Sequence, residues 1–188
     1  MPQTKFIEKL GELPHDKNSE FYEVIKSIYS ALYQEINNKL LFEQIINGKV
    51  LERKDTTLKK APEDLTKEIV IKPLFEFLGF KEEELHRETA SDSPIERKEA
   101  DYTLIVGNEK VLVEAEPLNK DLNIKGSGFY QVCGWLEKRS FKADYGIATN
   151  GFTWILIKYD PEDYKPKRLL VIELKGFFQE FLKGGRVT

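Results

Sequence analysis

The chain has 188 residues, of which 40% are hydrophobic and 32% are charged, and its net charge is −3. This length suffices for one domain with a core of its own, and the composition argues against disorder. No apolar run approaches the roughly 20 residues of a membrane span. The negative charge excludes a globally basic nucleic-acid-binding surface, so such binding would need a local basic patch. A single cysteine, Cys133, cannot form an internal disulfide, and we expect an intracellular, cytoplasmic protein.

The first helix predicted along the chain is long and amphipathic. Apolar residues recur at three- and four-residue spacing, and we expect a single helix from Ser19 to about Ile46. Ser19 suits the N-cap position because its hydroxyl can accept a hydrogen bond from a free backbone N–H group. The polar and basic stretch 51–61 is typical of a connector. Residues 1–61 are therefore predicted to form an N-terminal helical extension with its connector.

A second helix is predicted over residues 62–78. Pro62 suits its first position and Gly79 suits its end, because proline needs no hydrogen-bonded N–H there and glycine tolerates a left-handed cap. Pro73 lies inside the span and is expected to kink or divide the helix. This helix opens the second predicted domain, residues 62–188.

The rest of the chain is predicted to be rich in strands, with one helix inserted. A short strand is expected near Leu85–Thr89, and Gly126-Ser127-Gly128 introduces a helix over about 129–138. Three further strands and a short C-terminal helix are expected over 145–149, 153–159, 168–174 and 177–182. We therefore expect an α/β fold with a mixed central sheet of about four or five strands flanked by helices.

A β-hairpin is predicted near the middle of the chain. Runs rich in Val, Ile and Tyr flank Gly107-Asn108, a pair typical of a two-residue hairpin turn. With that loop, Val106 pairs with Glu109. Counting outward along both strands then places Asp101 directly opposite Glu114.

Three carboxylates are expected on one face of this hairpin. Side chains alternate along a strand, so Glu116 shares a face with Glu114, and Asp101 lies across from them. Like charges directly opposite each other are destabilising, and a divalent hard cation is the simplest compensation. The alternative, a solvated acidic face on a highly charged chain, stays open from this feature alone.

Further residues extend the pattern around the hairpin. They are the helix end Leu78-Gly79-Phe80, then Ala100-Asp101-Tyr102, Val113-Glu114-Ala115-Glu116 and Ala148-Thr149-Asn150-Gly151-Phe152-Thr153-Trp154. In this order they resemble the PD-(D/E)XK nuclease superfamily. Within it, the chain is similar to the N-terminal nuclease domain of type I restriction enzyme R subunits and of type IIG restriction enzymes. The resemblance covers residues 63–159 and implies a restriction-endonuclease-like fold.

The resemblance implies a metal-dependent endonuclease that hydrolyses phosphodiester bonds in DNA, as the nuclease part of a restriction system. Asp101 and Glu114 match the family's metal ligands, with Mg²⁺ as the cofactor and Mn²⁺ as a substitute. Glu68 matches a helix acid that supports the site. Gln131 matches a glutamine that orients DNA or a water molecule. With Glu116, these four residues are the candidate catalytic residues.

The chain departs from the family pattern at Glu116. The family has a lysine there, which contributes positive charge near the attacking water, whereas glutamate contributes the opposite charge. Some members work with glutamate at this position, where it helps to bind metal or acts as a base. Lys120, four residues on, is a candidate to replace the lost charge. Lys120 and Lys125 are also the candidate DNA-binding residues.

Three hypotheses about function remain open from the sequence. The first is the endonuclease, with DNA as substrate and methyltransferase, translocase or specificity subunits as partners. The second is a non-catalytic DNA-binding or scaffold module on the nuclease fold, which Glu116 and the negative net charge favour. The third is a structural protein that oligomerises through its N-terminal helix. A resemblance in fold does not by itself decide among them.

Overall fold

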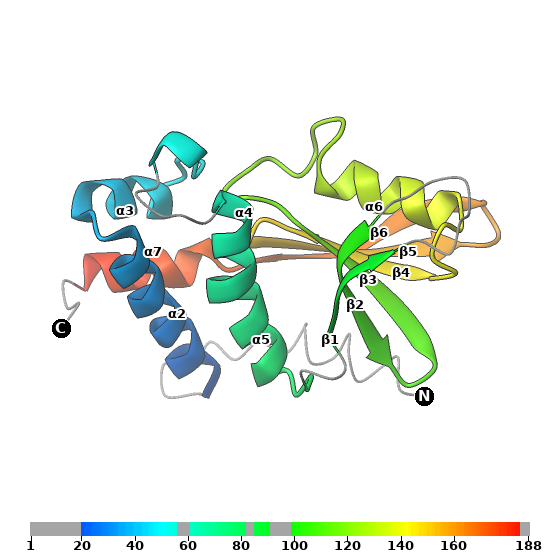
Figure 1. Ribbon diagram of the computed structural model, residues 1–188, viewed down its shortest axis with the longest axis horizontal. Helices are drawn as coiled ribbons and strands as arrows, with labels where there is room; N and C mark the ends of the chain where they lie inside the picture. Colours follow the sequence, from blue (N-terminus) through cyan, green and yellow to red (C-terminus); the bar gives the residue numbers. More distant parts are fainter. Residues whose placement is uncertain (1–19, 56–60, 82–84, 91–98, 185–188) are drawn as a thin grey trace.

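The computed structural model describes residues 20–55, 61–81, 85–90 and 99–184. Within them, a six-stranded sheet lies between helices (Figure 1). The strands follow the chain order from β1 to β6. Strands β3 and β4 are parallel, and every other neighbouring pair is antiparallel. The predicted α/β fold with a mixed sheet is confirmed, and the sheet has one strand more than the upper end of the expectation.

The N-terminal helical region consists of two helices, α2 (Glu20–Ile36) and α3 (Lys39–Ile46), so the prediction of one continuous helix is wrong. The break occurs at Asn37, whose φ of 46° lies in the left-handed region that asparagine tolerates better than most residues. Asn38 then caps α3, because its side chain accepts a hydrogen bond from the Leu41 N–H at 3.0 Å. The predicted N-cap of the first helix, Ser19, lies outside the described residues.

The second predicted helix is present, in three consecutive segments. They are α4 (Pro62–Leu65), the π-helical η2 (Thr66–Ile71) and α5 (Lys72–Phe77). The wide turns of η2 lie directly before Pro73, whose ring would clash with the preceding turn of a regular α-helix. Gly79 follows with a φ of 86°, which confirms its predicted place at the helix end. A short 3-10 turn, η1 (Arg53–Asp55), precedes this helical stretch.

The strands agree with the predicted order. They are β1 (Leu85–Ala90), β2 (Glu99–Val106), β3 (Glu109–Ala115), β4 (Tyr145–Thr149), β5 (Thr153–Asp160) and β6 (Lys165–Glu173). Gly107 adopts a φ of 64° in the turn between β2 and β3. Val106 pairs with Glu109 across that turn, so the predicted register of the hairpin is confirmed.

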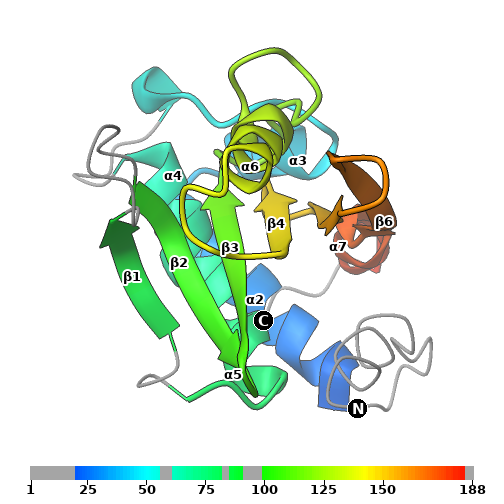
Figure 2. The same ribbon diagram turned by 90° about the vertical axis from the view of Figure 1, so that its right-hand side faces the viewer.

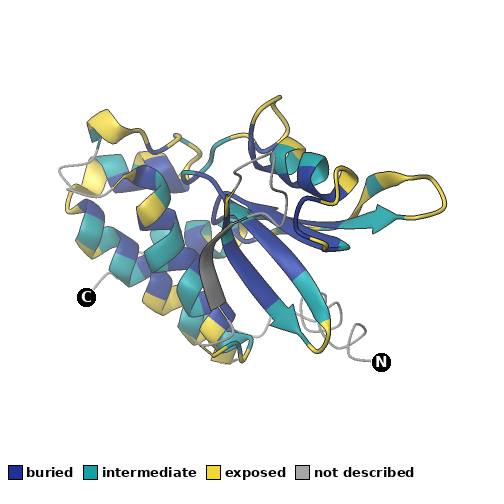
Figure 3. Cartoon of the chain, turned by 45° about the vertical axis from the view of Figure 1, so that its right-hand side comes forward, coloured by how far each residue is buried: buried dark blue, intermediate teal, exposed yellow. Residues whose placement is uncertain are grey.

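Two hydrophobic clusters cover the two faces of the sheet. The larger one joins the sheet to α2, α3, α5 and α7 (Lys175–Lys183). The smaller one lies under α6 (Gly128–Glu137), which crosses the opposite face in Figure 2. Buried residues accordingly concentrate where the helices meet the sheet (Figure 3). The helices of the predicted extension thus share a core with the sheet, and the domain boundary at residue 61 stays a prediction.

Candidate active site

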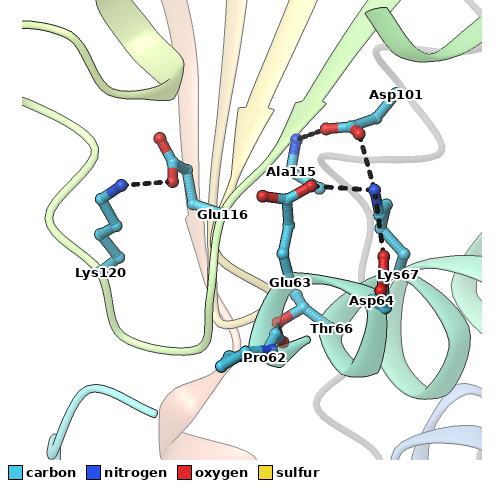
Figure 4. A network of polar contacts seen from close by, with 9 residues as sticks. All are labelled: Pro62, Glu63, Asp64, Thr66, Lys67, Asp101, Ala115, Glu116 and Lys120. Carbon is cyan, nitrogen blue, oxygen red and sulfur yellow. Dashed lines mark hydrogen bonds and ion pairs between the residues drawn. The ribbon is translucent and has the colours of Figure 1, made fainter. Parts of the chain in front are cut away.

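The start of β2 and the end of β3 meet the helical stretch 62–77 at one end of the sheet (Figure 4). Tyr102 pairs with Val113, and the same register places Asp101 opposite Glu114 one step further out. The Oδ2 atom of Asp101 accepts a hydrogen bond from the Ala115 N–H at 2.8 Å. A backbone group of the neighbouring strand therefore fixes the orientation of the Asp101 carboxylate.

A lysine from η2 enters this acidic site. The Lys67 ammonium lies 2.9 Å from Asp101 Oδ1 and 2.9 Å from Glu63 Oε1, and 3.6 Å from Asp64 Oδ1. The side chains of Lys67 and Asp101 are only 16% and 13% exposed. Burial lowers the pKa of Lys67, but the hydrogen bonds to Asp101 and Glu63 more than offset this, and the pKa lies above its usual range. Lys67 is therefore charged.

Glu114 is surrounded by other carboxylates. Burial, and to a smaller extent the negative charges of Asp101, Glu116 and Glu63, together raise the pKa of Glu114 to about 9. The charge of Lys67 acts in the opposite direction. The raised pKa favours the protonated form of Glu114 in the protein without a metal. We call Glu63, Lys67, Asp101, Glu114 and Glu116 the strand-end cluster.

Glu116 connects the end of β3 to α6. Its side chain is almost fully buried, with Oε1 accepting a hydrogen bond from the Gly128 N–H at 2.9 Å. Its Oε2 atom lies 2.8 Å from the Lys120 ammonium. The hydroxyl of Ser127, at the N-cap, instead donates to carbonyl groups of the preceding loop. The Glu116 carboxylate therefore satisfies the first backbone N–H of α6, where the helix dipole favours an anion.

The other predicted site residues differ in how close they lie to the carboxylates and in how exposed they are to solvent. Lys120 reaches the site through its ion pair with Glu116, whereas the Lys125 side chain is exposed on the loop before α6. Gln131 follows Gly128 by three residues and thus lies on the same side of α6. No hydrogen bond joins its side chain to the carboxylates among the described residues. Glu68 is half-buried on η2. The catalytic roles of these residues stay predictions.

Two residues of the cluster were missed by sequence reasoning. Glu63 and Lys67 stand four positions apart and form an ion pair, a spacing that places two side chains on one face of a helix. That spacing was the available signal. It did not show that this face points at Asp101, because Lys67 lies in the π-helical segment, whose turns are wider than those of an α-helix.

The chemistry of the cluster fits a magnesium ion. Among the residues that the structure describes, no three His, Cys, Asp or Glu side chains are grouped closely enough to hold a metal as they stand. Mg²⁺ is, however, commonly bound by one or two carboxylates together with waters and substrate phosphates. Asp101 and Glu114, opposed on neighbouring strands, offer these two carboxylates.

The fold and this site define a class of protein, the restriction-endonuclease-like α/β domains. The chain belongs to the family described as type I restriction enzyme R protein N terminus (HSDR_N), whose model matches residues 62–172. It is also 36% identical over 190 residues to a protein of Methanocaldococcus jannaschii provisionally named a type II restriction enzyme and methyltransferase. That alignment covers 97% of this chain but only 16% of the relative. No solved structure matches the chain.

These comparisons confirm the resemblance to restriction enzyme domains and identify the chain as a component of a restriction system. In the described part of the chain, no helix is long and apolar enough to cross a membrane. Cys133 is half-buried against the cluster under α6, and burial raises the pKa of its thiol to about 11, which makes it a poor nucleophile.

Proposed function

We propose that this chain is a metal-dependent DNA endonuclease domain that hydrolyses phosphodiester bonds in a restriction system. The observation that carries the proposal is the Asp101–Glu114 pair, opposed on neighbouring strands in a domain of a restriction enzyme family. Burial and neighbouring carboxylates disfavour the charged form of the half-buried Glu114, which is costly for a purely structural site. Groups with strongly shifted pKa values cluster at functional sites.

Each residue has a physical role in this proposal. Asp101 and Glu114 hold Mg²⁺, which when bound supplies positive charge to the phosphate and lowers the pKa of a water molecule. The Ala115 N–H keeps the Asp101 carboxylate oriented toward the site. Glu116 anchors the N-terminal turn of α6, which carries Gln131.

The DNA contacts are proposed to come from lysines beside the cluster. Lys120 lies at the edge of the site, and Lys125 projects from the following loop. Positive side chains at such positions attract the phosphate backbone irrespective of sequence, and their contribution falls as salt concentration rises. We therefore expect the isolated domain to cut DNA with little sequence preference.

A plasmid cleavage assay tests the proposal. Wild-type protein is expected to nick or cut plasmid DNA with Mg²⁺ or Mn²⁺ and to lose this activity in EDTA. Asp101→Asn and Glu114→Gln are expected to lower the rate at least about a hundredfold. Glu23→Gln, an exposed carboxylate on α2, is the matched control and is expected to cleave like the wild type. Metal-dependent cleavage that survives both site substitutions would exclude these carboxylates as the catalytic centre.

The wider enzyme supplies the remaining activities in this proposal. The M. jannaschii relative is named for both restriction and methylation, and the chain spans only 16% of its length. We propose that sequence recognition, methylation or DNA translocation resides in other domains or subunits. Sequencing the ends of DNA cut by the isolated chain tests this division. Random ends support it, and a defined recognition sequence contradicts it.

A second candidate function is a non-catalytic DNA-binding or scaffold module. It is favoured by the two lysines that already compensate the acidic site, Lys67 at Asp101 and Lys120 at Glu116. For such a module, a gel-shift assay would show DNA binding that does not depend on metal, with no cleavage in Mg²⁺ or Mn²⁺. Cleavage by the wild type that Asp101→Asn abolishes would exclude it.

A further inference from the structure

The ammonium group of Lys67 is held among carboxylates from two elements. Asp101 belongs to β2, whereas Glu63 and Asp64 precede Lys67 by one turn of its own helix. Figure 4 shows Lys67 between Asp101 and Asp64, with Glu63 reaching the same ammonium. The lysine thus joins the helical stretch to the strand that carries the predicted metal ligand.

Both oxygens of Asp101 are engaged. Oδ2 accepts from the Ala115 N–H at 2.8 Å, and Oδ1 contacts Lys67 at 2.9 Å. The first partner is a backbone group of β3 and cannot leave without disrupting the sheet. The second is the end of a flexible side chain. A cation that binds Asp101 therefore meets Lys67 as its competitor.

We propose that Lys67 is the resident counter-ion of the strand-end cluster and that a divalent metal competes with its ammonium for Asp101. The inference deepens the proposed function and rests on it for the metal. Without metal, Lys67 neutralises the carboxylates. When metal takes Asp101, Glu63 and Asp64 retain the ammonium beside the site, because both belong to the same helical stretch as Lys67. Lys67, on the helical stretch, thereby supplies the positive charge that the family's lysine would contribute at the position of Glu116.

A merely structural ion pair predicts a different outcome. Removing such a pair lowers the melting temperature by a similar amount with and without metal. Removing a competing counter-ion lowers the melting temperature mainly in the absence of metal. It also tightens metal binding, because one positive charge that repels the metal is gone. The affinity for metal therefore separates the two roles.

The primary experiment is a calorimetric titration of Mn²⁺ into the whole chain. Lys67→Gln is expected to bind Mn²⁺ roughly tenfold more tightly than the wild type. Lys67→Arg keeps the charge and is expected to bind like the wild type. Lys167→Gln is the matched control, because Lys167 also pairs with two aspartates, near the turn between β5 and β6, and its side chain is 43% exposed. It is expected to leave the affinity unchanged. A Lys67→Gln protein that binds Mn²⁺ no more tightly than the wild type overturns the inference.

A labelling experiment on the wild type keeps the inference testable if Lys67→Gln does not fold. Reductive methylation followed by mass spectrometry reports how accessible each lysine amine is. Lys67 is expected to react several times faster in Mn²⁺ than in EDTA, whereas Lys167 reacts equally in both. Equal reaction of Lys67 in the two conditions contradicts the competition.

The outcomes separate this inference from the proposed function. Wild-type protein that binds Mn²⁺ without cutting DNA, while Lys67→Gln binds more tightly, sinks the nuclease proposal and supports the counter-ion. If the wild type cuts DNA but Lys67→Gln binds Mn²⁺ no more tightly than the wild type, the nuclease proposal is supported and the counter-ion inference is overturned. A wild type that binds no Mn²⁺ overturns both.

Discussion

Two clusters in this molecule have nearly the same local chemistry. In the strand-end cluster, Lys67 is held by Asp101 and Glu63. In a second group, which we call the turn cluster, Lys167 is held by Asp160 and Asp163 near the turn between β5 and β6. In each case the carboxylates raise the pKa of the lysine. The Lys67 side chain is 16% exposed, and that of Lys167 is 43% exposed.

The difference in burial decides what each cluster can do. Water solvates the separated charges of the turn cluster almost as well as it solvates the ion pairs, so these pairs contribute little to stability. In the strand-end cluster, the side chains of Lys67 and Asp101 are largely shielded from water. Burial and the neighbouring carboxylates also raise the pKa of Glu114 there, which favours its protonated form. A similar set of lysines and acids therefore has strong electrostatic interactions only where the fold shields the side chains from water.

The largest expected effect in either cluster is that of Glu116→Lys. The substitution removes the acceptor for the Gly128 N–H and places a second cation beside Lys120, at the positive end of α6. We expect a loss of stability of about 3 kcal/mol, or about 6–12 °C in melting temperature. Cleavage is expected to fall with it. A thermal melt and a plasmid-nicking assay measure the two effects.

Glu116→Gln is the matched variant, because the amide oxygen can still accept from Gly128. It is expected to lose roughly 1 kcal/mol. Asp163→Lys makes the corresponding charge reversal in the turn cluster and is expected to lower the melting temperature much less, because its charges are solvated. If Glu116→Lys melted like the wild type and cut DNA faster, Glu116 would instead be the remnant of a lysine site.

A further effect is expected in the pH dependence of stability. Between the ordinary pKa of 4.5 and the folded-state value of about 9, the unfolded chain releases the Glu114 proton while the folded protein keeps it. Rising pH across this window therefore destabilises the metal-free protein. Glu114→Gln is expected to flatten this slope. Chemical denaturation in EDTA at several pH values measures it, and equal slopes for both proteins would contradict the buried-proton assignment.

The turn cluster sharpens the pH comparison. The hydrogen bond from Lys167 lowers the pKa values of Asp160 and Asp163, so their contribution is present above the ordinary value and is lost as pH falls through the folded-state value. The two clusters therefore respond in opposite directions and in different pH ranges.

The smallest effect is expected for Lys167→Gln. Its partners are solvated, and we expect little change in stability. Lys67→Gln in EDTA is expected to cost more, because the Asp101 side chain is only 13% exposed and loses its cation. Urea denaturation of the two variants compares them directly. Equal losses would mean that burial does not distinguish the clusters.

The hairpin was predictable because its cause is local. Gly107-Asn108 fixes a two-residue turn, and the turn fixes the register that opposes Asp101 and Glu114. The division between α2 and α3 was missed because the hydrophobic spacing continues through it. The signal lay in the side chain of Asn38, which can cap a helix as well as continue one.

The composition of the site was only partly predictable. The carboxylates lie on paired strands, where alternation dictates the face. Lys67 meets Asp101 across 34 positions in the sequence, through packing of η2 against the start of β2, which no local pattern encodes. Glu116 was interpreted as a metal ligand or base. Its contact with Gly128 depends on how α6 returns to the sheet.

The most direct test of the metal site is a thermal melt of wild-type and Asp101→Asn protein in EDTA and in Mn²⁺. At about a hundred times its dissociation constant, a metal that binds only the folded state stabilises it by about 2.7 kcal/mol, which is about 5–11 °C here. Asp101→Asn is expected to melt lower in EDTA, because Lys67 loses a partner, and to respond little to Mn²⁺. Equal shifts with Mn²⁺ in the two proteins would contradict a metal site at Asp101.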